Sequence, residues 1–254
     1  MYEKYKSTVR RIGKMAMIAV AAMLIASAAY TQNIEDVLDI KKNEATQSKV
    51  TVDVEKDAAI VLEKMLEMVF VEGDSTISSF SIGKYEVTQG MWQAVMGDNP
   101  SSFKNGDDYP VEMLNVYDVQ QFLNKLNTMT GKNYRLPLVE EWEYAARGGN
   151  KSKGFQYSGS NDINDVAWYN GNSGSRTRGG HTHSVGEKQP NELGIHDMSG
   201  NVSEICQSVG YRVFRGGSWL NNAGNCRISG SQPIVANLKD RWSGAGLRLV
   251  LPVQ

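Results

Sequence analysis

The segment Gly216-Gly217-Ser218 places a serine directly after a glycine turn, where its hydroxyl could be exposed as a nucleophile. Such a nucleophile needs a neighbouring base, and the position of none of the three histidines singles it out for that role. The sequence contains no GxSxG, GxGxxG or Walker motif. The common hydrolase, dinucleotide-binding and phosphate-loop chemistries are therefore not supported.

Two carboxylates, Asp197 and Glu204, flank the bend DMSGNVSE. Calcium binds carboxylate and backbone carbonyl oxygens together, so this bend could hold a hard cation. The alternative is a solvated turn. His181 and His183 alternate as two ligands on one face of a strand would, but without further ligands at metal-binding spacing they are interpreted as loop histidines.

The chain has two cysteines, Cys206 and Cys226. They could form a disulfide, act as a redox pair or lie as buried thiols, and the disulfide is favoured if the protein is exported. Export is indicated by the amino terminus, where five basic residues precede the apolar run MAMIAVAAMLIASAA. Residues 1–29 are therefore predicted to be a signal peptide. A retained membrane anchor is the alternative, but the run is shorter than a typical span, which favours the signal peptide.

Residues 30–64 are rich in charge, and we expect them to form a spacer that contains a short helix. From residue 65 onward the composition and the short apolar segments indicate one irregular domain with many glycines. The patterns predict short strands at MVFV, ISSFSIGKYEV, YRVFRGG and GLRLVLPV. They predict helices after Thr88, after Asn115 and at LVEEWEYAARGG, the first two ending at Gly97 and Gly131. The fold class is α+β, loop-rich, with few short helices and strands.

The charge of the chain is nearly balanced, with 27 Lys and Arg against 28 Asp and Glu. Binding to nucleic acid requires an excess of basic residues to neutralise phosphates, so no nucleic-acid partner is expected. No stable membrane span is expected after cleavage of the signal peptide.

Several blocks together resemble, in the right order, the formylglycine-generating enzyme family, whose domain is also called the sulfatase-modifying factor domain. They include FSIGKYEVTQGMWQAVMGDNPSSF, YRLPLVEEWEYAARGG, PNELGIHDMSGNVSE, RVFRGGSW and GLRLV. The resemblance covers about residues 68–254, and the domain is predicted over residues 65–254. It implies a single irregular α+β domain related to C-type lectins.

Members of that family oxidise a sulfatase cysteine to formylglycine, using two copper-binding cysteines in the loop after the glycine turn. In this chain the loop reads GGSWLNNAGNCRIS, and Asn221 stands at the first cysteine position. If the chain were active, Cys226 and Ser218 would be its catalytic residues. A two-thiolate copper site cannot form from one soft ligand, so copper is not expected.

The resemblance also implies a structural calcium ion, with Asp197 and Glu204 as side-chain ligands and Gly200 and Val202 as carbonyl ligands. We interpret the protein as an exported, periplasmic, cell-surface or secreted module that binds or assembles an exported protein or a glycan without catalysis. The alternative is a working sulfatase-modifying oxidase. The expected binding face is carried by the carboxy-terminal loops and comprises Trp219, Asn221, Asn222, Asn225 and Trp242.

Overall fold

The structure is a computed structural model that describes residues 59–175, 179–209, 211–229 and 240–253. The predicted signal peptide and all of the spacer before residue 59 lie outside the described residues. A helix at 59–65 falls in the stretch where the sequence predicts a short helix, and the unit that carries the fold is Leu66–Gln254. Within the described residues, no helix is both long enough and apolar enough to span a bilayer.

The first sheet is antiparallel and joins the beginning of the unit to its end. Its order is β1 (Met68–Val71), β2 (Phe80–Gly83), β8 (Val250–Pro252), with Val71 paired with Phe80 and Ile82 paired with Val250. Phe80 and Ile82 are both buried, as the alternation in ISSFSIGKYEV predicts.

Three helices begin where the sequence predicts them. The Thr88 hydroxyl accepts the N–H of Met91 at the start of α3 (Gln89–Met96), and left-handed Gly97 ends that helix. Asn115 and Asp118 form a reciprocal capping box at the start of α4 (Val116–Thr130), and left-handed Gly131 ends it. The third helix, α5, is Val139–Ala146.

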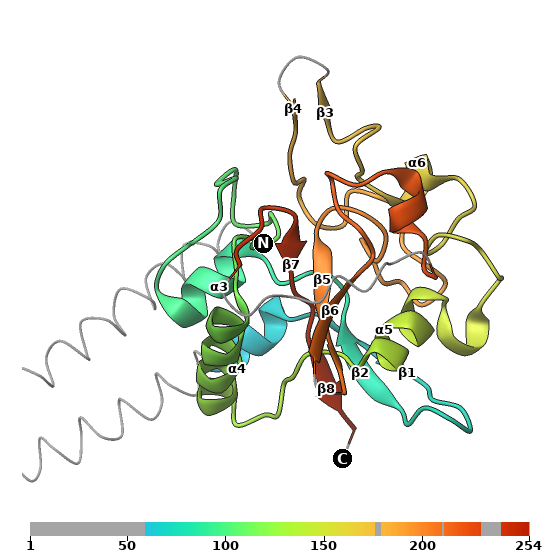
Figure 1. Ribbon diagram of the computed structural model, residues 1–254. Coiled ribbons are helices and arrows are strands. Elements are labelled where there is room, and N and C mark those ends of the chain that lie inside the picture. The colour runs from blue at the N-terminus through green and yellow to red at the C-terminus, as the bar shows by residue number, and fades with distance from the viewer. Residues whose placement is uncertain (1–58, 176–178, 210, 230–239, 254) are drawn as a thin grey trace, which may run out of the picture. The chain divides into compact units, whose positions relative to one another are not determined.

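The second sheet lies in the loop-rich half. It has the order β6 (Tyr211–Arg215), β5 (Ser203–Ser208), β7 (Ala245–Gly246), with β6 antiparallel and β7 parallel to β5. Figure 1 shows these strands along the middle of the unit, with α3 and α4 on one side and α5 on the other. The remaining elements are short: η2 (Gly149–Lys151), α6 (Ile163–Val166), β3 (Gly174–Ser175), β4 (Gly179–Gly180) and η3 (Ala223–Cys226).

The main core forms where α5 covers both sheets. Trp142 of α5 is fully buried, and it lies in one cluster with Ile82 of β2, Cys206 of β5 and Val213 of β6. A second, smaller cluster gathers α6 and η3 around Cys226. Few short helices and strands around these clusters make an α+β, loop-rich domain, and the predicted fold class is confirmed.

One strand prediction is wrong, and the sequence analysis missed strand β5. The pattern GLRLVLPV is not one strand: it starts at β7 and ends at β8, and fully buried Arg248 lies between them outside either ladder. Strand β5 was not predicted, because Glu204, Ile205 and Cys206 are all buried in succession and leave no alternation to detect.

Candidate functional site

The glycine turn after β6 brings the candidate catalytic loop together. Gly216 and Gly217 both have positive φ, of 85° and 68°, a region that side chains with a Cβ rarely adopt. A Cβ on Gly217 would lie 2.8 Å from the Asn225 carbonyl oxygen and 2.9 Å from the Cys226 Sγ. The turn therefore allows the loop 218–226 to fold back tightly against itself.

Asn221 holds Ser218 in place. Its Oδ1 accepts both the backbone N–H of Ser218, at 2.9 Å, and the Ser218 hydroxyl, at 2.8 Å. An amide oxygen is not a base at neutral pH, and Ser218 itself is buried. The serine therefore closes the turn, and its hydroxyl donates to an amide oxygen and not to a base that could activate it.

Cys226 lies inside the second core cluster. It ends η3 and packs with Tyr157, Ile163, Val166 and Ala167. Burial raises the pKa of its thiol to about 12, so the sulfur remains protonated at neutral pH. A cysteine acts as a strong nucleophile or metal ligand only as the thiolate, and the protonated thiol of Cys226 is suited to neither role.

The two cysteines lie in different core clusters. Cys206 packs in the main cluster on β5, where burial and the Glu204 charge raise the pKa of its thiol well above the usual range. Both cysteines are free thiols, so the expected disulfide between Cys206 and Cys226 is not formed in this structure. Of the three alternatives, the structure shows buried thiols, because β5 and η3 place the two cysteines in separate apolar clusters.

The expected binding face is divided between the interior and the surface. Trp219 is buried and donates its indole N–H to the Ser243 carbonyl oxygen at 3.0 Å, so it packs inside the loops. Asn222 caps η3 by accepting the N–H of Asn225 at 3.2 Å. The side chain of Trp242, in contrast, is 38% exposed and belongs to the surface.

Trp242 borders an apolar groove on the second sheet. The indole lies 5.2 Å, centroid to centroid, from the ring of Phe214 on β6. The groove is lined by Leu114, Asn115, Val116, Ile205, Phe214, Asp240, Trp242 and Ala245. An apolar floor with a polar rim is typical of a surface that receives a side chain of a partner.

The two alternating histidines belong to an aromatic stack. The His183 ring lies 3.7 Å from the Trp168 ring and 4.6 Å from the His181 ring, and Lys188 covers the Trp168 ring at 4.2 Å. His183 Nε2 lies 3.0 Å from the Ser173 carbonyl oxygen, and burial lowers the pKa of its imidazole. With its rings stacked face to face, this pair serves packing, as the interpretation of loop histidines expects.

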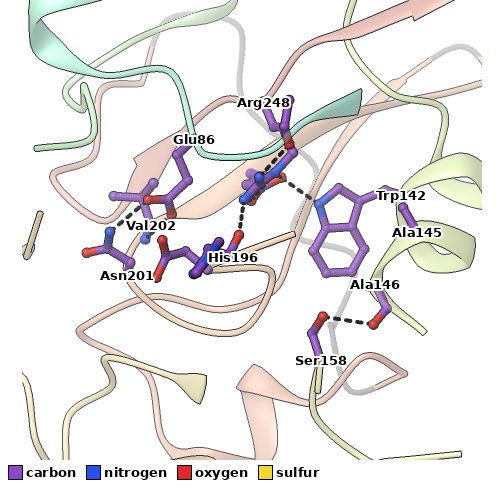
Figure 2. Close-up of polar contacts among 12 residues, drawn as sticks. Glu86, Trp142, Ala145, Ala146, Ser158, His196, Asn201, Val202 and Arg248 are labelled. Carbon is purple, nitrogen blue, oxygen red and sulfur yellow. Dashed lines mark hydrogen bonds and ion pairs between the residues drawn. The ribbon is translucent and has the colours of Figure 1, made fainter. Parts of the chain in front are cut away.

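Two of the predicted calcium ligands, Asp197 and Glu204, belong to a buried charge network around Arg248, which Figure 2 labels together with Glu86. Glu204 is engaged already: its Oε1 accepts from Arg248 Nη2 at 2.7 Å and its Oε2 accepts the Trp142 indole N–H at 2.6 Å. The Asp197 Oδ2 accepts the N–H of Gly186 at 2.7 Å, whereas Oδ1 is buried with no hydrogen-bond partner among the described residues.

A free buried Oδ1 would suit a hard cation, but the same cation at Glu204 would be repelled by the guanidinium of Arg248. The four predicted ligands therefore do not fit calcium as a complete set, and the calcium site stays a prediction. Among the described residues, no three His, Cys, Asp or Glu side chains form a group that could hold a metal ion.

The network also contains a residue that the sequence analysis did not single out. Glu86 is fully buried, and its two oxygens accept the Val202 N–H at 3.0 Å and the Asn201 amide at 2.7 Å. Burial, followed by the charges of Asp197 and Glu204, raises the pKa of Glu86 well above the usual range. The signal that could have revealed this network is Arg248, an arginine inside the apolar run GLRLVLPV.

Residues 50–252 match the family described as "Sulfatase-modifying factor enzyme 1-like domain". The chain belongs to this family. It is 39% identical over 216 residues to the chaperone protein LppX of Paenibacillus barcinonensis, a match that covers 64% of this chain and 77% of LppX. It is 30% identical over 148 residues to the inactive Cα-formylglycine-generating enzyme 2 of Bos taurus, covering 54% of this chain and about half, 47%, of that relative.

Solved structures share the fold of this sulfatase-modifying-factor domain. Treponema denticola variable protein 1 is 30% identical with a TM-score of 0.61, covering 73% of this chain and 91% of that one. CarF is 29% identical with a TM-score of 0.60, covering 73% and 93%. PvdO from Pseudomonas aeruginosa, at 21% identity and a TM-score of 0.56, covers 73% and 90% and is similar in fold alone.

Proposed function

We propose that this sulfatase-modifying-factor domain is a non-catalytic binding or assembly module that acts on an exported protein or a glycan. One observation carries the proposal. Asn221 occupies the position of the family's first catalytic cysteine, where its amide binds Ser218, and the thiol that remains, Cys226, is buried and protonated. A two-thiolate copper site does not fit these residues.

The names of two similar proteins support the proposal. One is a chaperone and another is an inactive formylglycine-generating enzyme, so a role without oxidation has precedent among similar chains. Export is part of the proposal and rests on the basic, apolar and small-residue order of the amino terminus. The nearly balanced charge supports a protein or glycan partner over a nucleic acid.

An aldehyde assay tests the absence of catalysis. The full chain is incubated with copper, oxygen and a CxPxR peptide, and formylglycine is sought by mass, with an active formylglycine-generating enzyme as the positive control. No aldehyde is expected, because the loop after the glycine turn carries one buried thiol, Cys226, in place of the pair that the oxidase requires. Turnover that disappears in Cys226→Ser would establish the alternative, an oxidase, and overturn the proposal.

A further inference from the structure

The outer edge of β6 is open for pairing among the described residues. The strand order β6-β5-β7 leaves β6 at the end of its sheet. The N–H groups of Ser203 and Gln207 on β5 bond Gly244 and Pro137, on the side away from β6. By alternation, β5 bonds β6 through Glu204 and Cys206, whose partners on β6 are Arg215 and Val213.

The backbone groups of the intervening residues, Arg212 and Phe214, therefore point outward. The Phe214 carbonyl oxygen is occupied by the guanidinium of Arg215, at 3.2 Å. Among the described residues, the N–H groups of Arg212 and Phe214 and the carbonyl of Arg212 have no backbone hydrogen-bond partner. Such an edge is a template on which an extended chain can add a strand.

Arg212 and Phe214 also share one face of β6, because side chains two residues apart in a strand point the same way. Phe214 lines the groove beside Trp242, together with Ile205, its partner on β5. The opposite face of β6 carries Val213, which packs in the main core cluster. Arg212 therefore lies next to the groove, opposite Gln207 in the ladder.

The side chain of Arg212 is partly exposed, and one of its nitrogen atoms lacks a partner in the part of the protein that the structure describes. Its Nε is buried and has no hydrogen-bond partner among the described residues. Two neighbouring arginines are paired with carboxylates, Arg215 with Glu143 at 3.2 Å and Arg241 with Asp118 at 2.8 Å. A buried guanidinium N–H without a partner is costly, and a carboxylate supplies the planar pair of acceptors that a guanidinium matches best.

We propose that the β6 edge, the Trp242 groove and Arg212 form a docking site for an extended segment of a partner protein, in which an apolar side chain lies two positions from an acidic one. The segment adds a strand to β6, its apolar side chain packs over the groove against Phe214 and Trp242, and its carboxylate binds Arg212. The two-residue spacing follows from the strand, since Arg212 and Phe214 are themselves two residues apart. The proposal rests on the non-catalytic binding function and names the class of partner.

Fluorescence anisotropy with a defined peptide tests this site. The probe is a labelled threonine-rich peptide with leucine and glutamate two positions apart. A second peptide replaces the glutamate with glutamine, and a third is N-methylated along its backbone to prevent strand pairing. The first peptide is expected to bind, and both altered peptides are expected to bind at least about tenfold more weakly, because each loses a charged or a backbone contact.

Variants of the full chain locate the binding. Arg212→Met and Trp242→Ala are expected to weaken binding of the first peptide at least about tenfold. Lys151→Gln removes an exposed charge on η2, away from the second sheet, and is expected to leave the affinity unchanged. Thermal melting of each variant checks that it remains folded.

Two results would overturn the docking site. One is binding that is absent, or that is equal in Arg212→Met and in the unaltered chain. The other is a concentration-dependent dimer, seen by light scattering, that Arg212→Met dissociates, because the edge would then be an interface between two copies. Either result leaves the non-catalytic function standing, since only aldehyde formation overturns that.

Discussion

At the scale of single residues, one amide changes the chemistry of the loop. Asn221 both removes a soft metal ligand and fixes Ser218, since its Oδ1 accepts two hydrogen bonds from that serine. Cys226 sits eight residues after Ser218 with its sulfur turned into an apolar cluster. The loop therefore keeps the turn of the family while its functional groups are used for internal packing.

A buried carboxyl group gives a residue-scale prediction about pH. Glu112 is fully buried; its Oε1 accepts the Phe103 N–H at 2.7 Å, and its Oε2 has no partner among the described residues. Burial raises the pKa of Glu112, so the folded state binds a proton more tightly than the unfolded state. The contribution of Glu112 to the unfolding free energy therefore falls as the pH rises from the pKa that Glu112 has in the unfolded chain through its pKa in the folded chain.

Glu112→Gln removes this dependence while keeping an acceptor for Phe103. The unfolding free energy of the variant minus that of the unaltered chain is expected to be larger at pH 7 than at pH 4. Any cost of the new amide that does not depend on pH cancels in this comparison. Urea unfolding at the two pH values measures the difference. Equal differences in unfolding free energy at both values would show that Glu112 has the same pKa in both states.

At the scale of elements, short strands and turns determine which side chains meet. β5 contributes Glu204 to the charge network and Ile205 to the groove, because neighbouring residues of a strand face opposite sides. The turn that follows β6 then returns the chain over the second core cluster. A defect in this turn should affect the whole loop-rich half.

The turn can be tested with Gly217→Ala. The new Cβ would meet the Asn225 oxygen at 2.8 Å and the Cys226 sulfur at 2.9 Å, at a φ of 68°. We expect a loss of about 2–4 kcal/mol, from the left-handed backbone and from overpacking. Gly97→Ala is the matched control, because its φ is 90° but no atom lies within 4 Å of the added Cβ.

Denaturant unfolding of the two variants separates steric crowding from backbone strain. The control should lose about 1–2 kcal/mol, from the left-handed backbone alone. If both variants lost the same free energy, the contacts of Gly217 with Asn225 and Cys226 would contribute nothing, and the tight loop would be wrong.

At the scale of the whole molecule, Arg248 ties the two sheets together. Its guanidinium binds Glu204 of β5 and also donates to the carbonyl oxygens of Gly83, at the end of β2, and of His196, both at 2.8 Å. Figure 2 labels Arg248 and His196. Two further buried carboxylates, Glu86 and Asp197, lie close enough to interact with its charge. Among the described residues, Arg248 is therefore the buried cation around which three buried carboxylates gather.

Arg248→Met tests this central role. The variant leaves Glu204 buried without its cation, and we expect it to lose about 3–5 kcal/mol of unfolding free energy or to fail to fold. Lys84→Met breaks the exposed pair of Lys84 with Glu67, at 3.0 Å, and should change stability by less than about 1 kcal/mol. Similar midpoints of thermal unfolding for the two variants would contradict the central role of Arg248.

The sequence by itself determined the features that depend on neighbouring residues. Thr88 and Asn115 cap α3 and α4 as predicted, and Gly97 and Gly131 end them, because caps act within one turn of a helix. The order of several blocks indicated the family, which the match over residues 50–252 shows.

Only the tertiary structure decided the state of the side chains that seemed functional. Trp219 and Cys226 are buried, Glu204 is paired with Arg248 44 residues later, and Trp142 reaches Glu204 across 62 residues. Such pairs are set by how the sheets and α5 pack, and no local pattern encodes them. The position of β6 at the edge of its sheet, next to an Arg212 Nε without a hydrogen-bond partner among the described residues, has the same origin, since strand order is a property of the folded chain.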